Sequence, residues 1–114
     1  MTVVNGTTGS PRLGKDEVVE VTGRVIITSD PSDGLFQEGD ILVTSMTTPD
    51  YVPLFSKAIA VVTDGGSILC HAAIVAREYG IPAVVATQNA TTQLTSGVEA
   101  TVRVSRQGGT VTQE

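Results

Sequence analysis

Residues 58–86 read AIAVVTDGGSILCHAAIVAREYGIPAVVA, and this stretch decides the fold of the chain. The continuous apolar run over 58–63 is typical of a strand that is buried on both faces. Residues 71–79 predict a helix that ends at Gly80, because glycine readily adopts the left-handed conformation that terminates helices. A second buried strand is expected over 81–86. Strand, helix and strand in this order predict a parallel crossover unit.

The flanking segments add mainly strands, which we expect over 18–28 (bent at Gly23), 41–44, 99–104 and 110–113, with Gly108 and Gly109 separating the last two. Short helices are expected directly after Thr48, whose hydroxyl suits the free amides of a helix start, and over 89–96. On the helix over 71–79, the side chains expected to face the core are Ala72, Val75, Ala76 and Tyr79. Together these expectations predict an α/β fold with a mixed sheet and a few short helices.

The first seventeen residues contain three glycines, one proline and mostly small or charged side chains. Such a composition is typical of a linker, because it offers little apolar surface to bury. We therefore expect a flexible arm or linker over 1–17 and one folded domain over 18–114.

Composition excludes several classes of protein. A formal charge of −5, with two Tyr, two Phe and no Trp, offers neither the clustered cations nor the stacking rings of a nucleic-acid binder. One His and one Cys cannot build a zinc site, and no group of carboxylates suggests another metal. No apolar stretch is long enough to cross a membrane, and the first fifteen residues lack the apolar core of a secretory signal. The single Cys fits a reducing compartment, so we expect a cytoplasmic protein. From the charge, the few aromatic rings and the short apolar stretches, we expect neither a membrane nor a nucleic-acid partner.

The segment best suited to carry out a reaction joins a glycine loop to a histidine. The loop Asp64-Gly65-Gly66-Ser67 follows a buried strand, and Cys70-His71 opens the next helix. The first turn of a helix presents unpaired amides and a partial positive charge, which favour a bound anion and disfavour a charged imidazole. A neutral His71 next to an anion site can attack a phosphoryl group and then hold it. The alternative is an ordinary helix-start histidine after a turn that requires glycine. Neither strong nucleotide-binding glycine motif is present, so we expect no ATP site in this domain.

Residues 63–85 resemble the signature of the phosphohistidine domain, the mobile domain of phosphoenolpyruvate-utilising enzymes such as phosphoenolpyruvate synthase and pyruvate phosphate dikinase. The segments 39–43, 47–51 and 89–92 are also similar to that family, so the resemblance extends from Val18 to the C-terminus. It implies a swivelling β/β/α domain in which His71 carries the phosphoryl group. The residues it implies as support for the phosphate loop are Asp64, Gly65, Gly66, Ser67, Cys70 and Ala72.

Two positions depart from the family pattern. Ser67 stands where the family usually has a second adjacent glycine, which puts the shape of the loop in doubt more than its chemistry. Leu69 stands where Thr or Ser is frequent, so regulatory phosphorylation at that position is not expected. Asp64 is expected to orient the loop or the imidazole. For Arg77 and Glu78 we expect a structural ion pair or a docking contact.

The favoured function is therefore that of a phosphoryl-carrier domain, a phosphotransferase component that is inactive without partner domains or subunits. An ATP-grasp-like nucleotide-binding partner would phosphorylate His71, and a second partner would bind phosphoenolpyruvate, pyruvate or another acceptor. We expect Mg²⁺ and ATP or phosphoenolpyruvate on those partners and no cofactor on this domain. The alternative is a non-catalytic interaction or regulatory domain that retains the fold. The chain could be a stand-alone subunit or a piece of a larger enzyme.

Overall fold

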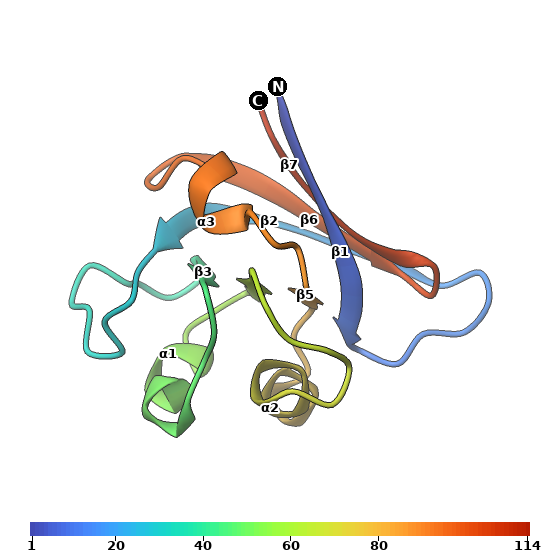
Figure 1. The fold of residues 1–114 in the computed structure, drawn as a ribbon, viewed down its shortest axis with the longest axis horizontal. Helices are drawn as coiled ribbons and strands as arrows, with labels where there is room; N and C mark the ends of the chain where they lie inside the picture. Colours follow the sequence, from blue (N-terminus) through green and yellow to red (C-terminus); the bar gives the residue numbers. More distant parts are fainter.

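The computed structural model describes residues 1–114, which form a barrel of seven strands with short helices packed against it (Figure 1). The strands are β1 (Thr2–Ser10), β2 (Val18–Ile27), β3 (Ile41–Thr44), β4 (Ala60–Thr63), β5 (Ala83–Val85), β6 (Glu99–Ser105) and β7 (Gly108–Gln113). The helices are the 3₁₀ turn η1 (Pro49–Tyr51), α1 (Val52–Phe55), α2 (His71–Tyr79) and α3 (Ala90–Gln93). None of them is long and apolar enough to span a membrane.

The barrel combines a parallel and an antiparallel half. The strand order is β1-β5-β4-β3-β2-β6-β7, and β7 pairs with β1 to close the barrel. The β2–β3, β3–β4 and β4–β5 pairs are parallel, whereas all pairs that involve β1, β6 or β7 are antiparallel. This arrangement confirms the prediction of an α/β fold with a mixed sheet and few short helices.

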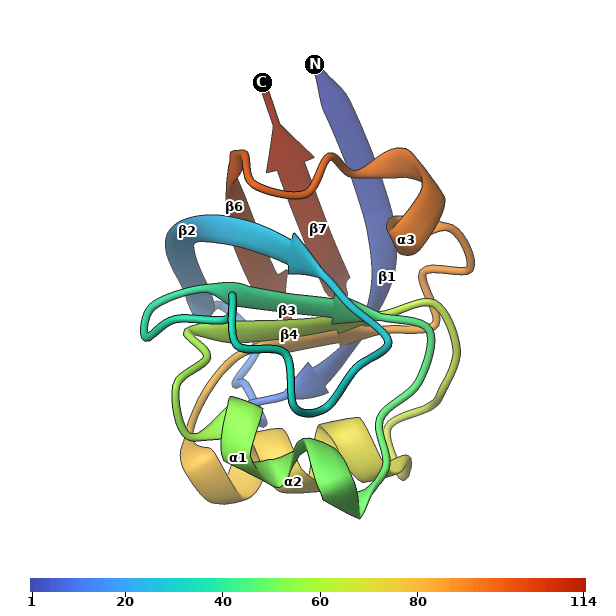
Figure 2. The ribbon, with the colours of Figure 1, turned by 90° about the vertical axis from the view of Figure 1, so that its left-hand side faces the viewer.

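The strands β3, β4 and β5 are buried on both faces, as their apolar sequences predict. Along β3, the side chains of Ile41 and Val43 belong to the core inside the barrel, while Leu42 packs outward in the core shared with α1 and α2. Figure 2 shows these two helices on one side of β3 and β4, with the antiparallel strands on the other side. The helices therefore cover the outer face of the parallel strands, and α2 is anchored to that face by Ala72, Val75 and Ala76.

The prediction of a flexible arm over 1–17 is wrong for residues 2–10, which form β1 between β5 and β7. Two of the three glycines that suggested a linker, Gly6 and Gly9, lie in β1 where neighbouring atoms approach closely. A Cβ atom at Gly6 would be 2.6 Å from the carbonyl oxygen of Val85, and one at Gly9 would be 3.0 Å from Cβ of Ala73. Gly6 must be glycine because the backbone of Val85 leaves no room for a side chain, and at Gly9 a side chain would be tightly packed against Ala73.

The helix α2 spans His71–Tyr79 as predicted, and Gly80 ends it in the left-handed conformation (φ 70°, ψ 28°). Four other expectations need correction. Tyr79 does not face the core, since 43% of it is exposed. Thr48 lies at the start of η1 without capping it through its side chain. Gly108 and Gly109 lie within β7, and the turn before it is formed by Arg106 and Gln107. The strands expected over 58–63 and 81–86 and the helix expected over 89–96 are shorter than predicted.

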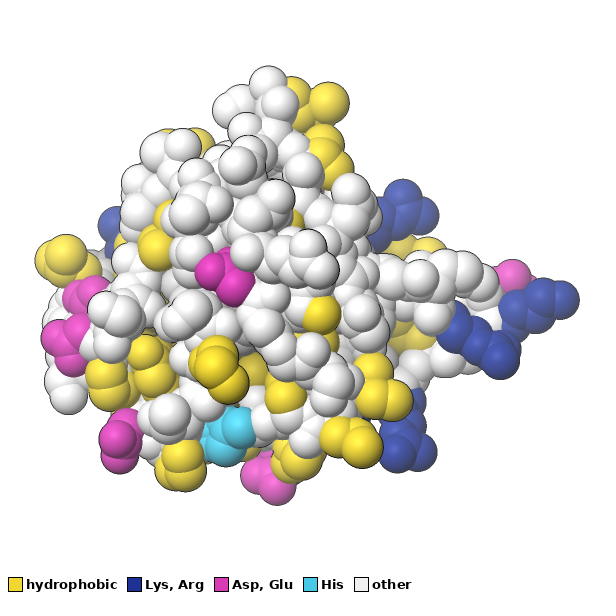
Figure 3. Space-filling view, in the orientation of Figure 1, with side chains coloured by type: hydrophobic (Ala, Val, Ile, Leu, Met, Phe, Trp, Pro, Cys, Tyr) yellow, Lys and Arg dark blue, Asp and Glu magenta, His cyan; other side chains and the backbone are white.

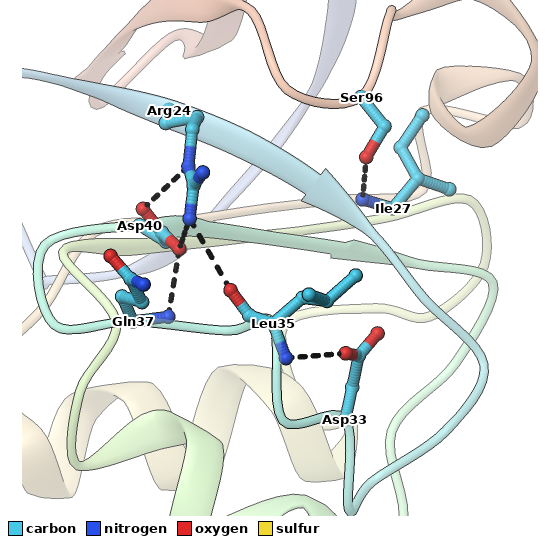
Figure 4. A network of polar contacts seen from close by, with 7 residues as sticks. All are labelled: Arg24, Ile27, Asp33, Leu35, Gln37, Asp40 and Ser96. Atoms are coloured by element: carbon cyan, nitrogen blue, oxygen red, sulfur yellow. Dashed lines mark hydrogen bonds and ion pairs between the residues drawn. The ribbon is translucent and has the colours of Figure 1, made fainter.

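The long connection between β2 and β3 is fastened by an ion pair (Figure 4). Arg24 Nη2 donates to the carboxylate of Asp40 at 2.9 Å and to the carbonyl oxygen of Leu35 at 3.3 Å. The same carboxylate accepts a hydrogen bond from the amide of Gln37 at 2.8 Å. The hydrogen bond and the charge of Asp40 raise the pKa of Arg24 above its ordinary value, so the guanidinium stays charged. These contacts hold the connection against the barrel.

Candidate functional site

The chain leaves β4 in a loop, residues 64–70, that leads directly into α2. Cys70 is the N-cap residue, with an extended backbone (φ −76°, ψ 164°) and no capping hydrogen bond from its side chain. The first amide hydrogen bond of the helix runs from Ile74 to the carbonyl of Cys70 at 3.0 Å. The amides of His71, Ala72 and Ala73 therefore have no acceptor within the chain, and the positive end of the helix dipole is left uncapped.

The ring of His71 is oriented from two sides. Its Nδ1 atom lies 2.8 Å from Oγ1 of Thr47, a buried residue in the segment that follows β3. The ring of Phe55 meets the imidazole in a T-shaped arrangement, with 6.2 Å between the ring centroids. No hydrogen bond within the chain reaches Nε2. The contacts leave the side chain half-buried and one ring nitrogen unpaired.

A small cavity of about 70 Å³ lies beside this histidine. It is lined by Met46, Thr47, Thr63, Gly65, Gly66, Cys70, His71 and Ala72. Five of the seven residues predicted for the site therefore meet around one cavity: Gly65, Gly66, Cys70, His71 and Ala72. The other two, Asp64 and Ser67, do not line it.

The two glycines of the loop have different constraints. Gly66 has a φ of +108°, and a Cβ atom there would lie 2.8 Å from Sγ of Cys70. Gly65 instead contributes its backbone: its amide donates to the carbonyl of Ser45 at 3.1 Å, and its carbonyl accepts from Ala86 at 3.1 Å. Conformation therefore requires glycine at Gly66, whereas Gly65 has ordinary space around its Cα atom.

Of the two roles expected of Asp64, the structure supports the one at the loop, since its carboxylate contacts Thr91 and makes no hydrogen bond to the imidazole. Its carboxylate accepts hydrogen bonds from the amide of Thr91, at 2.9 Å, and from the hydroxyl of the same residue. Its carbonyl accepts from the amide of Gln88 at 2.7 Å. Asp64 thus ties the loop after β4 to the start of α3, and the role expected of it at the histidine belongs to Thr47.

Ser67, inside the loop, and Arg77, on α2, both make hydrogen bonds that hold the loop in its conformation. The hydroxyl of Ser67 accepts a hydrogen bond from the amide of Leu69 at 3.2 Å, and its carbonyl accepts from Cys70 at 3.1 Å. Arg77, in the last turns of α2, donates through Nη2 to the carbonyl of Ile68. The expected ion pair of Arg77 is therefore wrong, because the only ion pair of the chain joins Arg24 to Asp40.

Sequence reasoning missed Thr47 as a partner of the histidine. The available signal was topological: parallel strands that are neighbours in a sheet have their carboxyl ends at the same edge. Since β3 and β4 pair in parallel, the segment after Thr44 and the loop after Thr63 must meet. No group of three or more His, Cys, Asp or Glu side chains lies together in a way that could hold a metal ion.

Comparison with known sequences finds relatives of this chain among phosphoenolpyruvate synthases. A family model described as the mobile domain of PEP-utilising enzymes matches residues 36–107. A probable phosphoenolpyruvate synthase of Staphylothermus marinus is 61% identical over 71 residues, which are 62% of this chain and 8% of the relative. The phosphoenolpyruvate synthase of Pyrococcus furiosus is 46% identical over 105 residues, which are 91% of this chain and 12% of the relative. The chain thus spans about a tenth of the length of the curated relatives it matches.

Comparison with solved structures finds two chains with a similar fold. A solution structure of Enzyme I is similar with a TM-score of 0.56 and 30% identity, over 75% of this chain and 34% of that one. The crystal structure of Thermococcus kodakaraensis aconitase X is similar with a TM-score of 0.60 and 17% identity, over 98% of both chains. The second likeness, at this low identity, is one of fold alone.

Proposed function

The chain belongs to the family of PEP-utilising enzyme mobile domains, and from this premise we propose that it carries a phosphoryl group on Nε2 of His71. The group is taken up from one partner site and delivered to another. The observation that supports this most directly is the contact between Nδ1 and the hydroxyl of Thr47, which leaves Nε2 as the unpaired ring nitrogen.

The proposed transfer proceeds in two balanced steps. With the ring proton on Nδ1, that N–H donates to Thr47 Oγ1 and Nε2 keeps its lone pair. The lone pair attacks phosphorus, a bond from Nε2 to phosphorus forms, and the bond from phosphorus to the oxygen of the donor breaks. In the second step an oxygen of the acceptor attacks phosphorus and the bond to Nε2 breaks. The proton on Nδ1 and its hydrogen bond are retained throughout.

The uncapped start of α2 supplies the electrostatic support. Oxygens of the phosphoryl group carry negative charge in the donor, in the transition state and on the histidine. The free amides of His71, Ala72 and Ala73 and the positive end of the helix dipole stabilise that charge without rearrangement. Because the helix start itself stabilises the charge of the phosphoryl group, we propose that Mg²⁺ binds at the partner sites.

The size of the cavity supports the proposal that partners hold the remaining parts of the reaction. About 70 Å³ accommodates a phosphoryl group but lies well below the roughly 300–1,000 Å³ of pockets that hold whole cofactors and metabolites. The cavity is too small for a nucleotide, and we propose that the nucleotide and the acceptor bind to partner domains. An ATP-grasp-like nucleotide-binding domain and a domain that binds phosphoenolpyruvate or pyruvate are the proposed partners, and alone the chain is expected to turn over no substrate.

The test uses a partner from a relative. The chain is incubated with ATP, and separately with phosphoenolpyruvate, in the presence of Pyrococcus furiosus phosphoenolpyruvate synthase that carries alanine at the position matching His71. Intact-mass spectrometry is expected to show one acid-labile phosphoryl group on the wild type and on Cys70→Ser, and none on His71→Ala. The control is the separately prepared mobile domain of the same Pyrococcus furiosus enzyme. If the partner phosphorylates that domain but leaves the wild-type chain unmodified, the non-catalytic interaction domain is favoured instead.

A further inference from the structure

A second, larger cleft lies next to the loop that precedes His71. Its volume is about 450 Å³, and three arginines, Arg12, Arg77 and Arg106, line it. Ile68 and Leu69 of the loop contribute apolar surface to the same cleft. Arg12 comes from the connection between β1 and β2, and Arg106 from the turn between β6 and β7. The fold thus brings cations from three distant parts of the sequence to one place.

These cations have no carboxylate partner within the chain. The only ion pair joins Arg24 to Asp40, and neither Arg12 nor Arg106 makes a side-chain hydrogen bond. The whole chain has only seven Lys and Arg residues and a formal charge of −5, so three of the seven line this cleft. In Figure 3 most of the visible Lys and Arg side chains lie toward the right of the view, on the side where β1 ends in Figure 1, whereas the visible carboxylates are spread over the left, the centre and the lower edge. A local excess of unpaired arginines is complementary to a surface that carries carboxylates.

The apolar part of the cleft lies close to the reactive histidine. Leu69 is 76% exposed and Ile68 is 52% exposed, although both are large apolar side chains. Leu69 is two residues before His71 in the chain. Apolar side chains surrounded by arginine are typical of the centre of a protein–protein interface, where they become buried on association.

We propose that this cleft is the surface on which the partner domain that phosphorylates His71 docks, through an acidic face that meets Arg12 and Arg106. The inference rests on the proposed function and adds the location and the charge of the contact. Arg77 contributes differently, since its Nη2 is already bonded to the carbonyl of Ile68 and its Nε is buried without a partner. It holds the loop against α2, and the two exposed arginines attract the partner.

The test compares charge reversal inside and outside the cleft. The double variant Arg12→Glu, Arg106→Glu is compared with Lys57→Glu, an exposed cation that precedes β4 and so lies at the opposite end of that strand from the loop. The initial rate of phosphorylation by ATP and the Pyrococcus furiosus partner described above is measured against the concentration of the chain, at low and at high salt. Phosphoramidate, a small phosphoryl donor that needs no docking, serves as the second donor.

The proposal expects a loss of about tenfold or more in kcat/KM for the double variant at low salt, a much weaker salt dependence than in wild type, and unchanged labelling by phosphoramidate. Lys57→Glu is expected to keep wild-type kinetics. Equal rates and equal salt dependence for the double variant and wild type would overturn the docking surface while leaving the carrier function intact. If the partner phosphorylates neither wild type nor variants, the carrier function fails, and the docking proposal falls with it.

Discussion

The parallel strands and the loops that leave their carboxyl ends are built in opposite ways. All residues of β3, β4 and β5 are buried, and most of them are Ile, Leu, Val or Ala with neighbours on both faces. The loop after β4 is half-buried or exposed, contains a glycine with positive φ, and ends at three amides without acceptors. The buried strands therefore form a rigid base for an accessible loop, and in the proposed carrier the residues that stabilise the fold are separate from those that react.

The first prediction concerns a substitution in the buried strands. Leu42→Ala removes a fully buried side chain between the sheet and the helices, and we expect a loss of about 2–5 kcal/mol in the free energy of unfolding. Urea denaturation measures it. His71→Ala, which truncates a half-buried ring, is expected to change the stability far less while abolishing phosphorylation. A stability loss of His71→Ala as large as that of Leu42→Ala would contradict the separation.

The second prediction concerns conformation within the loop. Gly66→Ala places a Cβ atom 2.8 Å from Cys70 Sγ at a φ of +108°, so we expect a cost of about 1–3 kcal/mol and slower phosphorylation of His71. Gly65→Ala is the matched control, because its Cβ would meet only ordinary contacts. Thermal unfolding and the phosphorylation rate are measured for both. Equal behaviour of the two variants would show that the loop has a different shape.

The third prediction separates two adjacent threonines. Thr47→Val removes the hydroxyl that contacts Nδ1 while keeping the shape of the side chain, and we expect the phosphorylation rate to fall about tenfold, or about 1.4 kcal/mol. Thr48→Val is the control, since its side chain makes no capping hydrogen bond. Thr47→Ser, which keeps a hydroxyl, is expected to recover most of the rate. A Thr47→Val rate equal to that of wild type would remove Thr47 from the site.

The smallest effect is expected at the edge of the loop. Asp64→Asn weakens the two hydrogen bonds to Thr91 and is expected to cost about 1 kcal/mol or less in stability, with little change in the phosphorylation of His71. Chemical denaturation and the phosphorylation assay measure the two quantities. A large loss of rate with unchanged stability would restore the role that sequence alone suggested for Asp64.

The sequence predicted α2 to its end residues because a helical apolar pattern and a terminating glycine are both local signals. It missed β1, whose small polar residues gain their role only by pairing with β5 and β7, far away in the chain. The loop glycines and His71 could be placed together because they are consecutive. Thr47 could not, since its contact with His71 spans 24 residues and depends on the β3–β4 pairing. Local sequence signals thus predict the segment that contains His71, whereas its contact with Thr47 follows only from the pairing of the strands.

In the proposed carrier, the contact with Thr47 commits Nδ1 of His71 and leaves Nε2 as the nucleophile. The most direct test is a ³¹P–¹H correlation NMR spectrum of the chain after phosphorylation, which reports the ring nitrogen that carries phosphorus. The account predicts a single phosphohistidine, at residue 71, with phosphorus on Nε2. Phosphorus on Nδ1, or on a residue other than His71, would contradict it.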